Sequence, residues 1–307
     1  MKNKSTSPIF IHSLFRAGST YLFNTFRRSS YNYYCYQEPL HEYLLHAKSD
    51  LQKLIEVEKD TIEQLNHPSL DKPYFYEFYL VSDVVVANFC KEFSFDQYFF
   101  QEKLDSHKCG HYLKELSNAA KGRPVFQFCR SAGRVKQIKY ECEGLHIFLW
   151  RNPWDQWWSY KVDTYFDLAN LLIVNSSNCP KLFITLKEQL GLDSFHSDNI
   201  EEELNFFSKR MLTAEGSYTL FYALWCHSYL EAKPLCDLDI NIDQLAISGS
   251  YRAAIVKELA EIGIVELDLS DCRLPNVVYG EKEMDFFVLE FLDQLKITNV
   301  CVENTNE

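Results

Sequence analysis

Residues 9–27 constrain the fold most, because they read as a short apolar strand, a tight turn and a helix. The apolar residues 9–11 predict the strand, and the helix is expected over 18–27 with two hydroxyl residues in its first turn. Such a turn faces unpaired backbone N–H groups and the positive end of a helix dipole. Arg16 adds a permanent charge with a planar set of donors. The stretch therefore predicts an anion site, most naturally for phosphate or sulfate.

The same stretch has a simpler interpretation, since Ser and Thr are ordinary residues at the start of a helix. It is not a Walker A loop, in which a lysine follows the last glycine. Here Arg16 precedes Gly18 and no lysine follows it in the turn. From this stretch alone, an anion site and an ordinary helix start both remain open.

Basic residues also follow two later strands. The apolar runs 125–129 and 146–150 predict strands, and they end at Arg130 and Arg151. Strands that alternate with helices indicate a parallel sheet, and ligands of such sheets bind outside the carboxyl ends of the strands. We therefore expect Arg16, Arg130 and Arg151 to converge on one edge.

The whole pattern predicts an α/β fold with a central, largely parallel sheet flanked by helices. We expect a single domain over 1–307, with a helical insertion at about 166–232. Further strands are expected at 31–36 and 237–242, helices at 41–66, 113–121, 154–165, 251–262 and 281–296, and either helix or strand at 74–89.

Composition limits the class of partner. Hydrophobic residues make up 47% of the 307-residue chain, enough to build a large core. The net charge of −12 argues against nucleic acid as the main partner. His12 and Arg16 interrupt the first apolar tract, so neither a signal peptide nor a membrane span is expected. The ten cysteines are scattered without a Cys-x-x-Cys pair, which indicates no zinc site, no disulfide scaffold and a cytoplasmic location.

The second informative stretch is Arg-Asn-Pro-Trp-Asp-Gln-Trp-Trp-Ser-Tyr at 151–160. Arg151 lies at a strand end, and Ser159 lies two helical turns into the expected helix. An arginine and a serine so placed can hold a phosphate from two sides. The alternative is an arginine that caps a helix beside a packed tryptophan cluster.

Together the two stretches resemble the cofactor signature of the sulfotransferase superfamily, which uses 3′-phosphoadenosine 5′-phosphosulfate. In that family an early Pro-[Lys/Arg]-Ser-Gly-[Ser/Thr]-Thr segment binds the 5′-phosphosulfate, and residues 15–20, Phe-Arg-Ala-Gly-Ser-Thr, are similar to it. A later Arg-Asn-Pro-x-Asp-x-x-x-Ser-Tyr segment binds the 3′-phosphate, and residues 151–160 match it closely. The resemblance implies a P-loop NTPase-like sulfotransferase fold of the bacterial type.

The resemblance also implies a reaction and a set of residues. The chain would move a sulfuryl group from the cofactor to a hydroxyl or amine of a small molecule, glycolipid or saccharide, leave 3′-phosphoadenosine 5′-phosphate, and need no metal. The residues implied in cofactor binding are Arg16, Ala17, Gly18, Ser19, Thr20, Arg151 and Ser159. The late Arg-Lys-Gly loop of the cytosolic enzymes is missing, and 276–282 is only a weak substitute for its adenosine contacts.

Catalysis would involve Arg16, which stabilises the departing phosphate, and a general base. Glu38 is the first candidate base because it follows the second expected strand, and several family members place a carboxylate there. His41 is the second candidate, on its unperturbed pKa, and His12 is the third. Glu38, Arg130 and Arg134 are the residues expected to contact the acceptor. Each of these side chains could instead be a cap or a surface ion-pair partner.

Two other functions fit parts of the sequence. The first is a P-loop kinase or NTPase, which the missing lysine after the glycine and the absence of an obvious magnesium-binding aspartate disfavour. The second is a non-catalytic sulfotransferase-like scaffold that binds a partner through the aromatic segment 74–100. The acceptor and the oligomeric state are not indicated by any motif.

Overall fold

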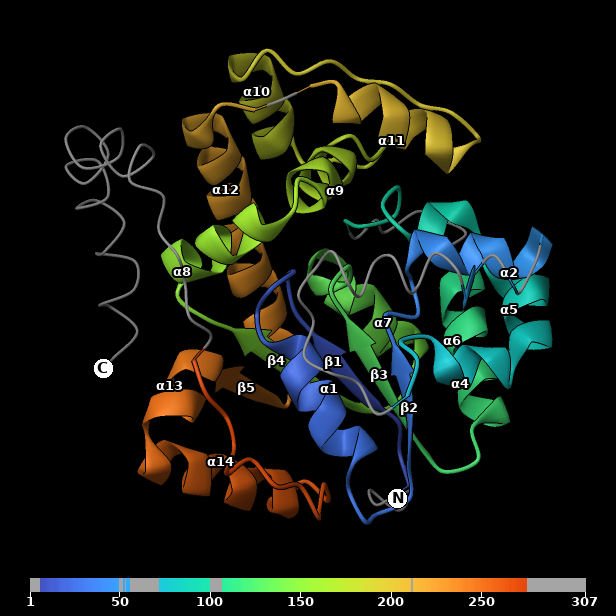
Figure 1. Ribbon diagram of the computed structural model, residues 1–307, viewed down its shortest axis with the longest axis vertical. Coiled ribbons are helices and arrows are strands. Elements are labelled where there is room, and N and C mark those ends of the chain that lie inside the picture. Colours follow the sequence, from blue (N-terminus) through green and yellow to red (C-terminus); the bar gives the residue numbers. More distant parts are fainter. Residues whose placement is uncertain are drawn as a thin grey trace.

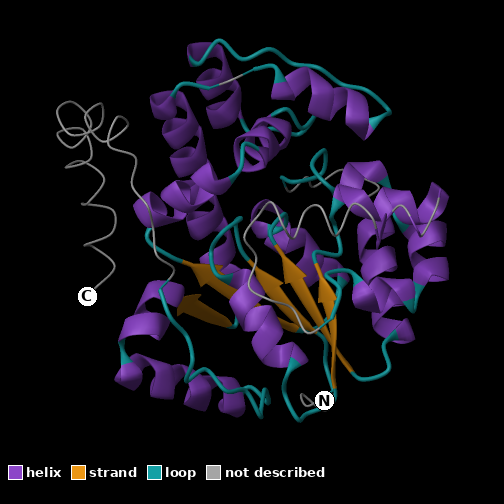
Figure 2. Ribbon diagram, viewed as in Figure 1, coloured by secondary structure: helices purple, strands orange, loops and turns teal. Residues whose placement is uncertain are grey.

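The protein is built on one five-stranded parallel sheet. In the computed structural model, the described residues are 6–49, 52, 54–55, 72–99, 107–210 and 212–274. Figure 2 shows the strands lying side by side in the order β2-β3-β1-β4-β5. The strands are β1 (Ile9–His12), β2 (Tyr33–Gln37), β3 (Arg123–Phe128), β4 (Leu145–Trp150) and β5 (Leu238–Asn241). Every neighbouring pair is parallel, so the predicted α/β class is confirmed.

Alternation along β1 sends its side chains to two different cores. Ile9 and Ile11 pack in a cluster with the helices α1 (Ser19–Arg27), α13 (Ile242–Ile247) and α14 (Gly249–Glu261). Phe10, from the opposite face, stacks on Phe126 of β3 with ring centroids 5.1 Å apart. Both faces of the sheet are therefore buried, as parallel sheets require.

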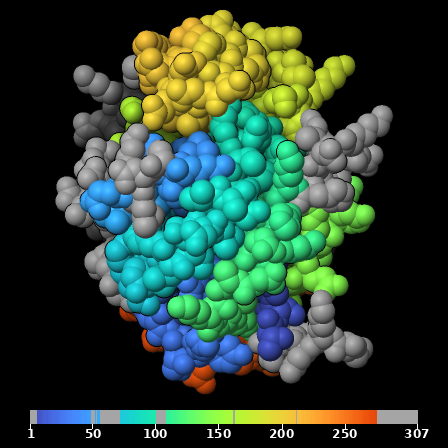
Figure 3. All heavy atoms as spheres, turned by 90° about the vertical axis from the view of Figure 1, so that its right-hand side faces the viewer, coloured from blue at the N-terminus to red at the C-terminus, as the bar shows by residue number. Residues whose placement is uncertain are grey.

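The face that carries Phe10 is covered by the helices between β2 and β4. Figure 3 shows these helices as the blue to green surface on one side of the molecule. They are η1 (Glu42–Leu45), α2 (His46–Ser49), α4 (Tyr76–Tyr79), α5 (Ser82–Asn88), η2 (Lys91–Phe93), α6 (His107–Ala119), η3 (Ala132–Arg134) and α7 (Val135–Glu141).

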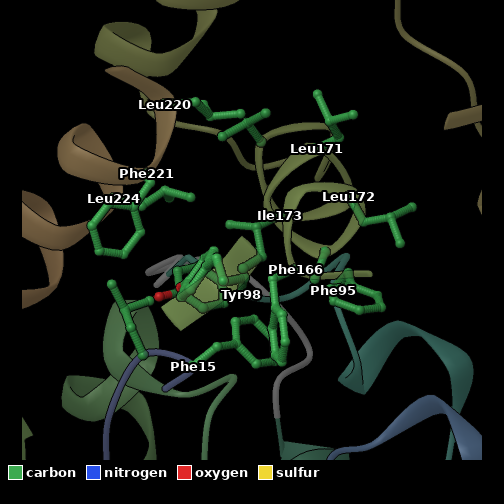
Figure 4. Packing of buried hydrophobic residues seen from close by; sticks show 14 of the residues in the cluster. Phe15, Phe95, Tyr98, Phe166, Leu171, Leu172, Ile173, Leu220, Phe221 and Leu224 are labelled. Atoms are coloured by element: carbon green, nitrogen blue, oxygen red, sulfur yellow. The ribbon is translucent and has the colours of Figure 1, made fainter. Parts of the chain in front are cut away.

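A group of helices lies above the carboxyl ends of the strands (Figure 1). It comprises α8 (Pro153–Trp158), η4 (Ser159–Val162), α9 (Tyr165–Val174), α10 (Lys181–Gln189), α11 (Ile200–Ser208), α12 (Ala214–Ala232) and η5 (Lys233–Leu235). Its core reaches down to the strand ends: Phe15, from the loop after β1, belongs to the same buried cluster as Phe166 and Ile173 of α9 and Phe221 of α12 (Figure 4).

The strand order places a switch point between β1 and β4. The chain leaves β1 through α1 toward β2, on the β3 side of the sheet, and leaves β4 toward β5, on the other side. The two connections therefore diverge from neighbouring strand ends. Ligands of open α/β sheets bind outside the carboxyl ends at such a point.

Several expected elements differ from the structure. The helix expected at 154–165 is interrupted, because Asp163 is extended and its carboxylate accepts a hydrogen bond from the N–H of Tyr165, which starts α9. The ambiguous segment 74–89 is helical, as α4 and α5. The helix expected at 281–296, the weak cofactor segment 276–282 and most of the helix expected at 41–66 lie outside the described residues. Among the helices that are described, none has the length and apolar character needed to cross a membrane.

Candidate functional site

The loop between β1 and α1 holds two residues in the left-handed backbone region. Gly18 has φ 83° and Arg16 has φ 62°. Only glycine adopts such a conformation at little cost. A Cβ atom at Gly18 would also lie 2.8 Å from Cγ2 of Ile242, at the start of α13. The glycine of the motif is therefore needed both for the turn and for the close approach of α13.

This turn places the first N–H groups of α1 at the carboxyl edge of the sheet. The N–H groups of Tyr21 and Leu22 donate to the carbonyl of Gly18, at 3.1 and 3.3 Å. The N–H groups of Ser19 and Thr20 precede these first intrahelical bonds, at the positive end of the helix. Such groups can stabilise a bound anion.

Arg16, in the loop after β1, reaches over the switch point to residues that follow β4. Its Nε donates to Oγ of Ser159 at 3.0 Å, and its guanidinium lies 5.5 Å from the ring centroid of Phe166. Burial lowers the pKa of Arg16, and the positive charge of Arg151 lowers it further. The two arginines of the two sequence motifs therefore lie close together in a buried place. An anion between them would relieve their repulsion.

Arg151 follows β4 and is only 3% exposed. Oδ1 of Asp243 lies 3.3 Å from its Nε, yet this buried Nε has no hydrogen-bond partner within the described residues. Oδ2 of Asp243 accepts from the N–H of Asn152 at 2.6 Å. No hydrogen bond joins Arg151 to Ser159 in the described part of the chain. Ser159 bonds to Arg16 instead. We call Arg16, Arg151, Ser159 and Asp243 the basic cluster.

Ser19 of the first motif contacts the residue that follows β3. Ser19 Oγ lies 3.3 Å from Sγ of Cys129, which also accepts from Nε2 of Gln127 at 3.2 Å. Burial raises the pKa of the Cys129 thiol. The side chain of Ala17 is buried in the core, so only the backbone of that residue can contribute to a site.

A second charged cluster lies at the ends of β2 and β3. Glu38 follows β2 with φ 45° and accepts hydrogen bonds from Tyr74 Oη at 2.7 Å and from Arg130. Arg130, 1% exposed, also pairs with Glu42 Oε2 at 3.0 Å. Tyr165 donates to Oε1 of Glu42 at 2.6 Å. We call Glu38, Glu42, Arg130, Tyr74 and Tyr165 the acidic cluster.

Burial shifts the pKa of Glu42 in the acidic cluster and the pKa of its neighbour His41 in opposite directions. Burial raises the pKa of Glu42 to about 7 and lowers the pKa of His41 to about 3. Nδ1 of His41 accepts from the N–H of Tyr43 and lies 3.2 Å from Oε2 of Glu42. Oε2 of Glu42 has no hydrogen-bond partner among the described residues, so its approach to His41 is a close contact and not a hydrogen bond.

Two predicted residues contact other parts of the chain. His12 is fully buried, bonded to Ser131 at 2.7 Å and to His146 at 3.0 Å, and burial holds its pKa well below the usual range. Arg134 donates to the carbonyl oxygens of Phe93 at 2.8 Å and Ser94 at 3.4 Å. These contacts occupy Arg134 with the backbone of the segment around η2.

One group with the chemistry of metal ligands consists of residues outside the two clusters. Ligand atoms of Asp96, His196 and Glu203 lie within 4.8 Å of one another. The ammonium of Lys91 lies 3.1 Å from Asp96 and 3.0 Å from Glu203. The lysine thus supplies the positive charge that these carboxylates attract.

Comparisons with protein-family models, with curated proteins and with solved structures found no match for this chain. The functional argument therefore depends on the geometry of the site and on the two motifs.

Four residues of the two clusters were not identified as site residues from the sequence: Glu42, Tyr74, Tyr165 and Asp243. Tyr74 is revealed only by its hydrogen bond to Glu38. Glu42 and Tyr165 carried no motif, and only their packing around Arg130 reveals them. Asp243 could have been found, because it directly follows the strand expected at 237–242 and so obeys the rule that selected the arginines.

Proposed function

We propose that this protein is a sulfotransferase with a P-loop-like sulfotransferase fold. It would transfer a sulfuryl group from 3′-phosphoadenosine 5′-phosphosulfate to a hydroxyl or amine of a small molecule, glycolipid or saccharide. The observation that carries the proposal is the convergence of Arg16 and Arg151 with the N-terminus of α1 at the switch point. Both residues belong to the segments that resemble the family's two phosphate-binding motifs.

The donor set suits a nucleotide with two anionic groups. Arg16 and the N–H groups of Ser19 and Thr20 would hold the 5′-phosphosulfate, and Arg151, whose buried Nε has no hydrogen-bond partner among the described residues, would take the 3′-phosphate. The bound donor supplies the sulfuryl group. Arg16 would stabilise the negative charge that develops on the departing phosphate oxygen, since a preorganised cation in a buried site acts strongly.

The acidic cluster would serve the acceptor. Glu38 is the proposed general base, and Arg130 and Tyr74 hold its carboxylate in place through the contacts described above. Its neighbour Glu42 is a second buried carboxylate that can take up a proton near neutral pH.

Isothermal calorimetry with 3′-phosphoadenosine 5′-phosphate tests the cofactor assignment. The wild type should bind, and Arg16→Ala and Arg151→Ala should each weaken binding about a hundredfold, the usual loss when a charged partner of a buried anion is removed. Arg28→Ala is the matched control, because Arg28 is an exposed arginine paired with Asp271. Equal affinity in the wild type and in both motif variants would contradict the proposal.

Turnover separates the remaining functions. Glu38→Gln should keep nucleotide affinity and lose sulfuryl transfer in a screen of acceptors with labelled cofactor. Retained turnover would assign the base to another residue. Magnesium-dependent ATP hydrolysis would favour a kinase or NTPase, and nucleotide binding without transfer to any acceptor would favour a scaffold.

A further inference from the structure

The first turn of α13 places a carboxylate on the second arginine of the basic cluster. We propose that Asp243 is a specificity-determining residue: it occupies the anion position at Arg151 and sets how strongly the site accepts a nucleotide with a 3′-phosphate. This inference rests on the proposed function, since it concerns the nucleotide that Arg151 would bind.

The contacts of Asp243 are those that a phosphate would make. One oxygen lies 3.3 Å from Nε of Arg151 and the other accepts from the N–H of Asn152 at 2.6 Å. Phosphate oxygens use the same two kinds of donor, a guanidinium and a backbone N–H. The contact with Arg151 is poorly aligned, because Nε has no hydrogen-bond partner within the described residues. Arg151 can therefore gain a better-aligned bond from another anion.

Burial indicates which partner can move. The side chain of Arg151 is 3% exposed, whereas that of Asp243 is 18% exposed. Two contacts hold the backbone around Asp243. Asn241 caps α13 by accepting from the N–H of Gln244, and the side chain of Ile242 packs against Gly18. A ligand would therefore displace the Asp243 side chain and leave α13 in place.

The charge of Asp243 affects two classes of nucleotide differently. A 3′-phosphate carries negative charge and must approach or replace the carboxylate, which costs repulsion or the loss of the ion pair. A 3′-hydroxyl is neutral and can hydrogen-bond to the carboxylate. Asp243 thus disfavours the 3′-phosphorylated nucleotide relative to one that lacks this phosphate.

A purely structural role makes the opposite prediction. If Asp243 only orients Arg151 for the phosphate, its removal weakens binding of the 3′-phosphorylated nucleotide. If Asp243 competes with the phosphate, its removal strengthens that binding. The sign of the change distinguishes the two roles.

The experiment is calorimetry on the full chain with adenosine 3′,5′-bisphosphate and adenosine 5′-phosphate. Asp243→Asn keeps an acceptor for the N–H of Asn152 and removes the charge. It should tighten binding of the bisphosphate about tenfold, and change binding of the monophosphate less than about twofold. Asp239→Asn is the matched control: Asp239 lies in β5, the strand that precedes α13, accepts from Nε1 of Trp150 at 2.8 Å and lies near Lys233.

Each other result decides against the inference. Weaker or unchanged bisphosphate binding in Asp243→Asn, or an equal gain for both nucleotides, would overturn it while the proposed function stands. If no form of the protein binds the bisphosphate, the proposed function itself is wrong and this inference fails with it. Asp243→Ala, checked by its thermal melt, provides a second variant with the same expected gain.

Discussion

The two charged clusters at the carboxyl edge of the sheet balance their charges in opposite ways. In the acidic cluster two glutamates surround Arg130. In the basic cluster Arg16 and Arg151 lie so close that the charge of Arg151 lowers the pKa of Arg16. Phe15 lies against the acidic cluster, with its ring centroid 5.0 Å from the guanidinium of Arg130 and 6.4 Å from the ring of Tyr165. Because Phe15 directly precedes Arg16 of the basic cluster, the two clusters are neighbours, and they differ in local charge.

This difference shows how each cluster can be neutralised. Burial disfavours the charged form of a carboxyl group and raises the pKa of Glu42 to about 7, so a proton can remove this negative charge near neutral pH. Excess positive charge on arginine cannot be removed by deprotonation near neutral pH. An anion can neutralise it. The comparison thus predicts that the acidic cluster takes up a proton and that the basic cluster takes up an anion.

The largest expected effect is the loss of Arg130. Arg130→Met keeps an apolar chain between Phe15 and Phe95 but leaves two buried glutamates without their cation. Breaking a buried pair in this way costs about 3–5 kcal/mol of unfolding free energy. Urea denaturation measures the loss. A second change, Glu42→Gln, should restore part of it, and a cost below about 1 kcal/mol for Arg130→Met would show that the cluster is not held by charge.

The pH dependence of stability tests the acidic cluster by itself. The pKa of Glu42 is raised from 4.5 to about 7 in the folded protein, so between these values the folded state binds a proton that the unfolded state has lost. Stability from this group is therefore present at low pH and lost as pH rises to 7, by about 3 kcal/mol in total. The stability difference between wild type and Glu42→Gln, followed by urea denaturation from pH 4 to pH 8, should fall accordingly.

His41 contributes to the pH dependence of stability with the opposite sign. The comparison of wild type with Glu42→Gln controls for this contribution. The pKa of His41 is lowered from 6.5 to about 3, so its contribution is lost as pH falls below 6.5. His41 is present in both proteins, and the difference curve mainly reports Glu42. Parallel curves for wild type and Glu42→Gln would contradict the assignment of the proton to Glu42.

Sulfate tests anion binding by the basic cluster without any nucleotide. At about ten times its dissociation constant, a sulfate that binds only the folded state adds about 1.4 kcal/mol to stability. Sulfate also stabilises proteins in general. We therefore expect a larger gain for wild type than for Arg16→Gln or Arg151→Gln at matched ionic strength, by thermal melts. Arg28→Gln should behave like wild type, and equal gains for all four proteins would remove the case for an anion site.

The elements around the site were predictable because their signals are local. Apolar runs and the glycine of the first turn located β1 and α1, and the rule that ligands meet strand ends selected Arg16, Arg130 and Arg151. The strand order was not predictable, since it depends on contacts between segments more than a hundred residues apart, such as the pairing of Ile9 with Val125.

Charge partners were less predictable than the charged residues themselves. The sequence motif predicts that Arg151 and Ser159 hold one phosphate together. It does not predict their partners within the protein, where Ser159 accepts from Arg16 and Arg151 lies beside Asp243. Sequence separation carries no information on which of two nearby arginines a serine contacts. The break in the helix at Asp163 was also missed, although its cause is local: Asp163 is extended and its carboxylate accepts from the N–H of Tyr165.

The smallest expected effect measures how Ser159 connects the two strand ends of the basic cluster. The hydrogen bond from Nε of Arg16 to Oγ of Ser159 links the loop after β1 to η4 after β4. A partly buried bond of this kind contributes about 1 kcal/mol. In a double-mutant cycle, Ser159→Ala and Arg16→Gln should therefore show a coupling energy near this value, measured by urea denaturation. Ser159→Ala should also weaken sulfate binding only slightly, because Arg16 keeps its charge. Additive effects on stability would mean that the bond does not join the two strand ends, and that Arg16 and Arg151 are held together by the backbone of the sheet.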